Sequence, residues 1–173
     1  MSAESQVIAP VSIAGAGNAL TTHDAVGPRV LELCEGRYGA AAELCHIGVT
    51  GLALLDHLRG QPLLIVVDAC IFGGPPGEIV RMEPDLEQES GRPTSVHQVG
   101  PLEALTVAKH LYPERLPQRV LLLLVETNGL DHETQEKACR ALLPILDDEV
   151  WSIAGGQRTS SAGAVSACAG ERS

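Results

Sequence analysis

Three short segments that lie far apart in the sequence contain side chains able to bind a metal ion. The residues are Asp24, Asp68 and His97, in the segments GAGNALTTHDAVG (15–27), LLIVVDAC (63–70) and TSVHQVG (94–100). Two carboxylates and one imidazole form a three-ligand set for a divalent metal and leave coordination positions open for a substrate. Taken singly, each residue also has an ordinary interpretation: either aspartate could cap a helix, and the histidine could lie in the core or on the surface.

The three residues fall where an α/β sheet presents side chains to a substrate. Asp68 closes a continuous apolar run, as expected of a residue at the carboxyl end of a buried parallel strand. Asp24 follows a predicted strand and glycine turn over 11–17, and His97 precedes a periodic helical stretch. Because functional groups gather beyond the carboxyl ends of such strands, we expect the three side chains to meet there.

Strand and helix signals alternate along the chain. They predict strands at 7–14, 42–47, 63–69, 77–83 and 119–125, and helices at 25–35, 50–58, 99–110 and 134–146. Thr50 is a candidate cap for the second helix, and Pro144 is expected to kink or end the last one. The alternation predicts an α/β three-layer sandwich: a mostly parallel, twisted sheet of about five strands with helices on both faces.

The length of 173 residues favours one domain. We assign residues 1–154 to it and expect 155–173, which are rich in Gly, Ser and Ala, to be a disordered tail. Aromatic residues make up only 2% of the chain, so the core must be packed from Val, Leu, Ile and Ala.

The net charge of −10 argues against nucleic acid or an anionic membrane as a partner. The polar start MSAESQ does not resemble a secretory signal peptide, and no apolar run is long enough to cross a bilayer. Five cysteines without a C-x-x-C pair are typical of free thiols in a reducing compartment, so we expect a cytoplasmic protein.

Taken together and in this order, the three motifs resemble those of the hydrogenase maturation endopeptidases. That family opens with a strand and G-x-G-N-x-L-x-x-D-D/E-x-x-G, has an Asp-Ala pair at the end of its third strand, and later an S/T-x-H-x-x-G element. This chain reads GAGNALTTHDAVG, VVDAC and SVHQVG. The resemblance covers roughly residues 7–150 and includes PPGEIV (75–80), which matches a P-G-T/E turn that leads into a strand.

The resemblance implies an endopeptidase that removes the C-terminal extension of a NiFe hydrogenase large-subunit precursor after nickel insertion. It implies that Asp24, Asp68 and His97 are catalytic and contact the nickel. We expect the precursor to supply this nickel, because three oxygen and nitrogen ligands with no cysteine among them hold the metal weakly in the free protein.

Two positions depart from the family pattern. His23 stands where the family usually has an acid; we expect it to point to solvent, although it could be a fourth metal donor. HIGVTG (46–51) replaces D-G-G-T-x-G, with His46 in place of the aspartate, in a loop that helps to choose the substrate in the family. The hydrogenase that is processed is therefore left open. Cys70, close to Asp68, is expected to be buried packing rather than a nucleophile.

Other functions remain open on the sequence alone. The two aspartates could share a proton and activate water without any metal. A small-molecule hydrolase or phosphorylase would need an anion-binding arginine, for which Arg29 is the nearest candidate. A non-catalytic nickel-sensing chaperone is compatible with the two histidine substitutions. A dinucleotide site is disfavoured because GAGN lacks the third glycine of the fingerprint.

Overall fold

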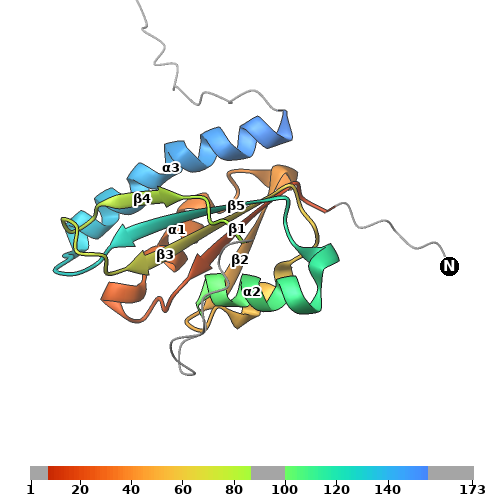
Figure 1. The fold of residues 1–173 in the computed structure, drawn as a ribbon. Coiled ribbons are helices and arrows are strands. Elements are labelled where there is room, and N and C mark those ends of the chain that lie inside the picture. Colours follow the sequence, from red (N-terminus) through yellow and green to blue (C-terminus); the bar gives the residue numbers. More distant parts are fainter. Residues whose placement is uncertain (1–7, 87–99, 156–173) are drawn as a thin grey trace, which may run out of the picture.

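Five strands form one sheet in the computed structural model, which describes residues 8–86 and 100–155 (Figure 1). The strands are β1 (Val11–Ala16), β2 (Ala42–Gly48), β3 (Leu63–Cys70), β4 (Ile79–Met82) and β5 (Arg119–Glu126). Their order across the sheet is β2-β1-β3-β5-β4. β1, β2, β3 and β5 are parallel, whereas β4 runs antiparallel to β5. All five predicted strands are present, in a mixed sheet.

Strand β3 lies at the centre of the sheet because it is apolar on both faces. Its residues Leu63–Val67 have no exposed surface. Ile65 belongs to the core cluster on one face of the sheet, whereas Leu64 and Val66 belong to the cluster on the other face. A strand of this kind is stable only where helices cover both of its faces.

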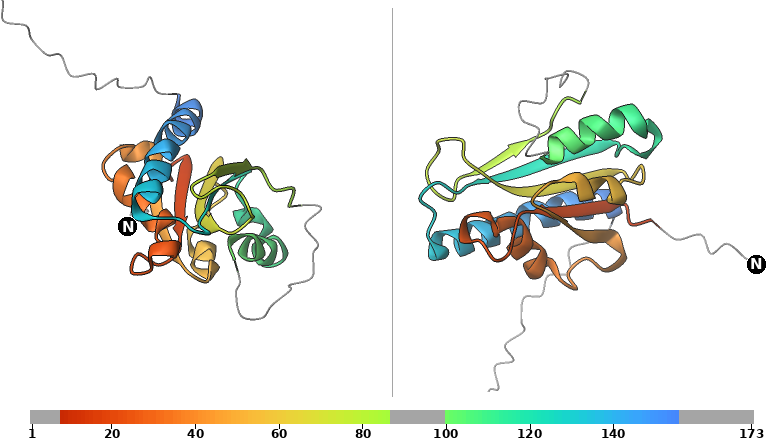
Figure 2. Two further views of the ribbon diagram at one scale, coloured as in Figure 1. Left: turned by 90° about the vertical axis from the view of Figure 1, so that its left-hand side faces the viewer. Right: turned by 90° about the horizontal axis from the view of Figure 1, so that it is seen from below.

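Helices cover both faces, as predicted. They are α1 (Val26–Cys34), α2 (Pro101–Leu111) and α3 (His132–Ala154), with the short 3₁₀ helices η1 (Thr22–Asp24), η2 (Gly39–Ala41), η3 (Leu52–His57) and η4 (Pro113–Arg115). α1 and α3 pack on one face, and α2 and η3 pack on the other. Figure 2 shows the sheet between α3 and α2. The predicted three-layer α/β sandwich is confirmed.

The predicted helix at 50–58 is a 3₁₀ helix, and Thr50 does not cap it. Gly51 occupies the cap position in the left-handed conformation, with φ of 62°. A Cβ on Gly51 would lie 2.7 Å from the carbonyl carbon of Gly100, so only glycine fits this close approach between two segments. The tight contact, rather than a capping side chain, determines where η3 begins.

Of the two effects predicted for Pro144, a kink in the last helix or the end of its regular part, the second is wrong. Helix α3 continues to Ala154, because Leu146 and Val150 are fully buried against the sheet and offset the hydrogen bond that proline cannot make. The helix also starts earlier than predicted, since the Asp131 side chain accepts a hydrogen bond from the backbone N–H of Thr134 (2.7 Å).

Other predictions concern residues beyond those described. The strand predicted at 7–14 is observed at Val11–Ala16. Residue 7 lies outside the described range. Gly155 terminates α3 in the left-handed conformation. Residues 156–173 also lie outside, so the domain boundary and the disordered tail remain predictions.

No helix within 8–86 and 100–155 combines the length and apolar character that a membrane span requires. The thiols of Cys34, Cys45, Cys70 and Cys139 are all free. Cys168 lies outside the described residues.

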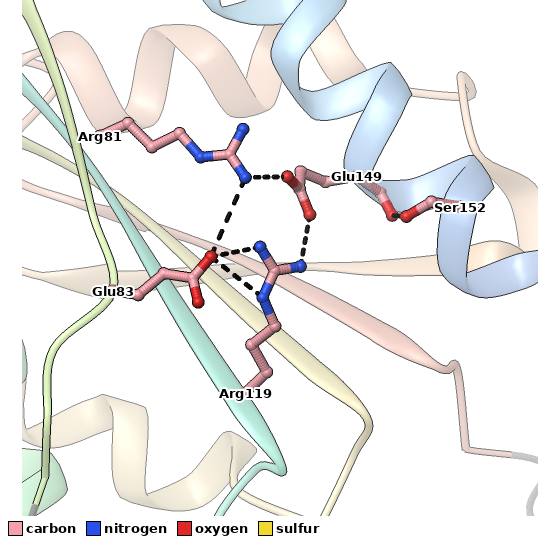
Figure 3. Close-up of polar contacts among 5 residues, drawn as sticks. All are labelled: Arg81, Glu83, Arg119, Glu149 and Ser152. Atoms are coloured by element: carbon pink, nitrogen blue, oxygen red, sulfur yellow. Dashed lines mark hydrogen bonds and ion pairs between the residues drawn. The ribbon is translucent and has the colours of Figure 1, made fainter.

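A cluster of ion pairs fastens the second half of α3 to the edge of the sheet (Figure 3). The Glu149 carboxylate, whose side chain is only 9% exposed, binds both Arg81 on β4 and Arg119 on β5, the latter at 2.6 Å. Arg119 also donates to Glu83 just beyond β4. One nearly buried carboxylate therefore joins a helix to two strands.

We predict that Glu149→Gln lowers the free energy of unfolding by about 1–3 kcal/mol, because it leaves two guanidinium groups without their shared countercharge while conserving side-chain volume. Chemical denaturation with circular dichroism measures the change. Glu133→Gln is the control on the same helix. Both side chains of the Glu133–Lys137 pair are exposed, so this pair should contribute at most about 0.5 kcal/mol to the free energy of unfolding. Equal effects of the two substitutions would show that the cluster does not stabilise the fold.

Candidate functional site

Asp24 and Asp68 lie at the carboxyl edge of two neighbouring strands. Asp24 ends η1, which follows β1, and Asp68 lies near the end of β3, which pairs directly with β1. Both residues are partly buried. The Asp24 carboxyl group contributes electrostatically to the raised pKa of Asp68, so it lies close enough to affect Asp68.

A tight turn positions Asp24. The backbone N–H of Asn18 donates to the Asp24 carbonyl (2.9 Å), and the Asp24 N–H donates to the Thr21 carbonyl (2.8 Å). Gly17 has a φ of 116°, and a Cβ there would lie 2.0 Å from the Asp24 carbonyl oxygen. Only glycine therefore allows the strand to turn this closely against the aspartate.

A second glycine contact places the start of α1 on β1. A Cβ on Gly27 would lie 2.2 Å from the Ala16 carbonyl oxygen, and one on Gly15 would lie 2.7 Å from the Gly27 carbonyl oxygen. The glycines of the first motif thus serve close packing of helix on strand. This contact was not anticipated from the sequence, although the glycine at the end of the motif is its visible signal.

Asp68 has the most strongly perturbed carboxyl group of the candidate site. Burial raises the pKa of Asp68 to about 6; a hydrogen bond from the backbone N–H of Ala69 opposes this rise, and the nearby Asp24 carboxylate adds to it. An aspartate whose pKa lies near neutral pH, beside a second carboxylate, can bind a metal ion or transfer a proton. Such perturbation is common at functional sites.

The residues near the two aspartates in sequence or at the same edge of the sheet differ in exposure. His23 is exposed, as expected, and His46 is exposed at the end of β2. Cys70 is only half-buried rather than buried; burial raises the pKa of its thiol, and the Asp68 carboxylate raises it further. A thiol held in its neutral form is a poor nucleophile, so the structure offers no support for Cys70 as one.

His97 lies outside the described residues, so its place relative to the two aspartates is not described. The chain returns to the described part at Gly100, which precedes α2 and contacts Gly51 in the loop after β2. Because β2 is parallel to β1 and β3, this contact lies at the same edge of the sheet as Asp24 and Asp68.

Glu126 is a positioning residue that the sequence did not single out. It is fully buried, and its carboxylate accepts hydrogen bonds from the backbone N–H groups of Phe72, Gly73 and Gly74 at 2.7–3.0 Å. Its other oxygen accepts from the Asn128 N–H (2.9 Å), the largest of the effects that lower the pKa of Glu126. The residue thereby holds the loop after β3. The sequence did contain a signal for Glu126, because this acid ends the apolar run LLLLVE just as Asp68 ends LLIVVD.

We predict that Asp68→Asn stabilises the fold by about 1–3 kcal/mol at about pH 8. The folded pKa lies above the ordinary value, so the folded chain binds the proton more tightly than the unfolded chain. Protonated Asp68 therefore stabilises the fold below about pH 4, and this contribution is lost as the pH rises through about 6. Denaturation at several pH values should show the difference between variant and parent shrinking as the solution is acidified.

The exposed residue Asp56 supplies the control, because its carboxylate is hydrated in both the folded and the unfolded chain. Asp56→Asn should change stability by less than about 0.5 kcal/mol over the same pH range. If Asp68→Asn is no more stable than the parent at about pH 8, the prediction that ionised Asp68 destabilises the fold is wrong.

Comparison with known proteins identifies related chains. The family model described as HycI, hydrogenase maturation protease, matches residues 28–142. The hydrogenase expression/formation protein HoxM of Cupriavidus necator is 31% identical over 121 residues, which cover 68% of this chain and 59% of HoxM. The hydrogenase 2 maturation protease of Escherichia coli is 25% identical over 125 residues, 70% of this chain and 75% of that protein.

Solved structures show the same fold. The hydrogenase maturating endopeptidase HybD from E. coli has a TM-score of 0.60 at 22% identity and aligns over 80% of this chain and 93% of its own. The NiFe hydrogenase maturation protease HybD from Thermococcus kodakarensis has a TM-score of 0.62 at 17% identity, and the alignment covers 81% of this chain and 98% of that protein. The chain spans about 59% of the length of HoxM. On the family match and the identity to HoxM, this chain belongs to the hydrogenase maturation protease family.

Proposed function

We propose that this protein cleaves the C-terminal extension from a NiFe hydrogenase large-subunit precursor. Membership of the family supports the reaction class. The observation that carries the proposal is the pair Asp24 and Asp68, brought from separate segments to one edge of the sheet, with the pKa of Asp68 raised to about 6. Ionisation of partly buried Asp68 beside a second carboxyl group lowers stability unless a positive partner is bound, so the pair is suited to a cationic substrate group.

In this proposal the two aspartates and His97 contact nickel that is carried by the precursor. Carboxylate and imidazole donors suit Ni²⁺, and the thiolates would come from the substrate. The nickel is part of the substrate, so the protease would cleave only a precursor that already contains its metal. The position of His97 in the sequence supports its role: it precedes Gly100 by three residues, and Gly100 contacts Gly51 at the edge of the sheet where the two aspartates lie.

A second mechanism is favoured by the same pair of carboxyl groups. With its pKa near 6, Asp68 could act as a general base or acid on a water molecule beside Asp24, without metal. His97 would then only position the substrate. Both mechanisms give the same cleavage, and they differ in whether the precursor must contain nickel.

The structure offers little support for a small-molecule hydrolase or phosphorylase. Arg29, the candidate anion-binding residue, binds Glu136 through both Nε (2.9 Å) and Nη2 (3.0 Å), and binds Glu32 through Nη1 (2.8 Å). Its guanidinium group is thus directed to two carboxylates. A non-catalytic chaperone is separated from the protease by whether the precursor is shortened.

We predict that Asp24→Asn and Asp68→Asn each lower the rate of precursor cleavage by at least about 1,000-fold. The amide conserves the shape of the side chain but removes the charge needed to bind a metal or accept a proton. Gel electrophoresis and mass spectrometry of the large subunit, mixed with purified protease, measure the cleavage.

Asp56→Asn serves as the matched control and should cleave at the parental rate, since Asp56 is exposed and lies in η3. Circular dichroism verifies that each variant is folded. Parental activity in Asp68→Asn would remove this residue from the reaction. Parental protein that binds the precursor without shortening it would favour the chaperone.

We predict that metal-free protease cleaves the nickel-containing precursor and leaves the nickel-free precursor intact, with rates that differ by at least about 100-fold. The precursor is matured with or without nickel, its metal content is determined, and the size of the large subunit is followed. Equal cleavage of both forms would contradict nickel recognition and favour the carboxylate-pair mechanism.

A further inference from the structure

A second group of metal-ligand side chains lies away from the two aspartates. Glu43 and Cys45 are two positions apart on β2 and therefore face the same side of the strand. His57 ends η3, which packs against that side. One ligand atom from each of the three residues lies within 4.8 Å of the others.

The His57 ring nitrogen Nδ1 is the feature that points to a missing partner. Within residues 8–86 and 100–155, it is the one buried side-chain nitrogen or oxygen without a hydrogen bond. It faces Glu43 Oε1 at 4.0 Å, too far for a hydrogen bond. A buried polar atom without a partner costs folding free energy, and a cation between these atoms would remove that cost.

Neighbouring residues support two of the three ligands, His57 and Glu43. Buried Gln61 donates through Nε2 to the His57 carbonyl (3.1 Å) and to the Ser12 hydroxyl on β1 (2.9 Å). Arg59 binds Glu43 Oε2 at 2.9 Å, so the other oxygen, Oε1, is the one directed toward His57. The backbone of the histidine and the orientation of the carboxylate are therefore both supported.

We propose that Glu43, Cys45 and His57 form a binding site for a borderline transition-metal cation of the Zn²⁺ type. A thiolate, an imidazole and a carboxylate are the ligand types that such cations prefer, whereas Mg²⁺ and Ca²⁺ require oxygen ligands. Glu43 and His57 are partly exposed, so the fourth position is open to water. The ligand atoms need to approach by about 1 Å to reach tetrahedral zinc geometry.

This site is separate from the proposed catalytic site. Glu43 and Cys45 pair in register with Ser12 and Ala14 within β1, whereas Asp24 follows the end of that strand. A metal would cross-link β2 to the end of η3 and so close the base of the intervening loop. That loop includes Gly51, which contacts Gly100. The proposal is independent of which reaction the protein catalyses.

The test uses Co²⁺ as a spectroscopic substitute for Zn²⁺, added to the metal-free full-length chain. We expect a thiolate-to-cobalt absorption band that saturates at one equivalent and is displaced by Zn²⁺. Cys45→Ser should abolish the band, and His57→Gln should weaken Co²⁺ binding by at least about tenfold. Cys70→Ser is the matched control, because Cys70 lies beside Asp68 and should not contribute to the band.

A second measurement follows thermal unfolding with and without Zn²⁺. Zinc should raise the midpoint of the parent and of Cys70→Ser, but should raise that of His57→Gln less, because a ligand that binds only the folded chain stabilises it. This readout does not depend on Cys45→Ser being folded. Absence of the cobalt band in the parent, its persistence in Cys45→Ser, or its loss in Cys70→Ser would overturn the proposal. The three residues would then form only a histidine–glutamate pair beside a buried thiol.

Discussion

The close contact between the end of β1 and the start of α1 is the constraint on which the proposed catalytic edge depends. It brings backbone against backbone at Gly15, Gly17 and Gly27, with no room for a side chain at any of them. The short turn that results returns the chain at Asp24 beside the neighbouring strand β3. A side chain at any of the three glycines would push the segment that contains Asp24 and the start of α1 away from β1, and so change the position of the first carboxylate.

Burial of Asp68 sets the stability of the free protein against the proposed function of this residue. The core strand β3 is fully apolar from Leu63 to Val67. The next residue is Asp68, and burial raises the pKa of its carboxyl group to about 6. A charge kept in such a position lowers the stability of the free protein. It also increases the gain from binding a positively charged substrate group, which is what the proposed nickel recognition requires.

Carboxylates elsewhere in the protein are used in a different way. Glu149 is matched by two arginines (Figure 3). Glu126 is matched by four backbone N–H groups, so each of the two carboxylates is compensated within the protein. Asp68 has no arginine or lysine among the groups that affect its pKa. This difference separates structural acids from the one that is suited to a substrate. The cluster of Glu43, Cys45 and His57 is intermediate, because Arg59 matches the carboxylate while the imidazole Nδ1 is left without a hydrogen bond.

The sequence by itself determined the order of the strands and helices, the acid near the end of the third strand and the acid in the turn after the first, because periodicity and strand-end polarity are local properties of a chain. It also carried the glycine motif, although not the reason for it. Only the tertiary structure decided that β4 pairs antiparallel with β5, that α3 passes Pro144, and that Gly51 rather than Thr50 begins η3. Each of these depends on contacts between segments distant in sequence, as do the raised pKa of Asp68 and the meeting of Cys45 with His57. Long-range approach and desolvation arise only when the chain is packed, so no local pattern could have revealed them.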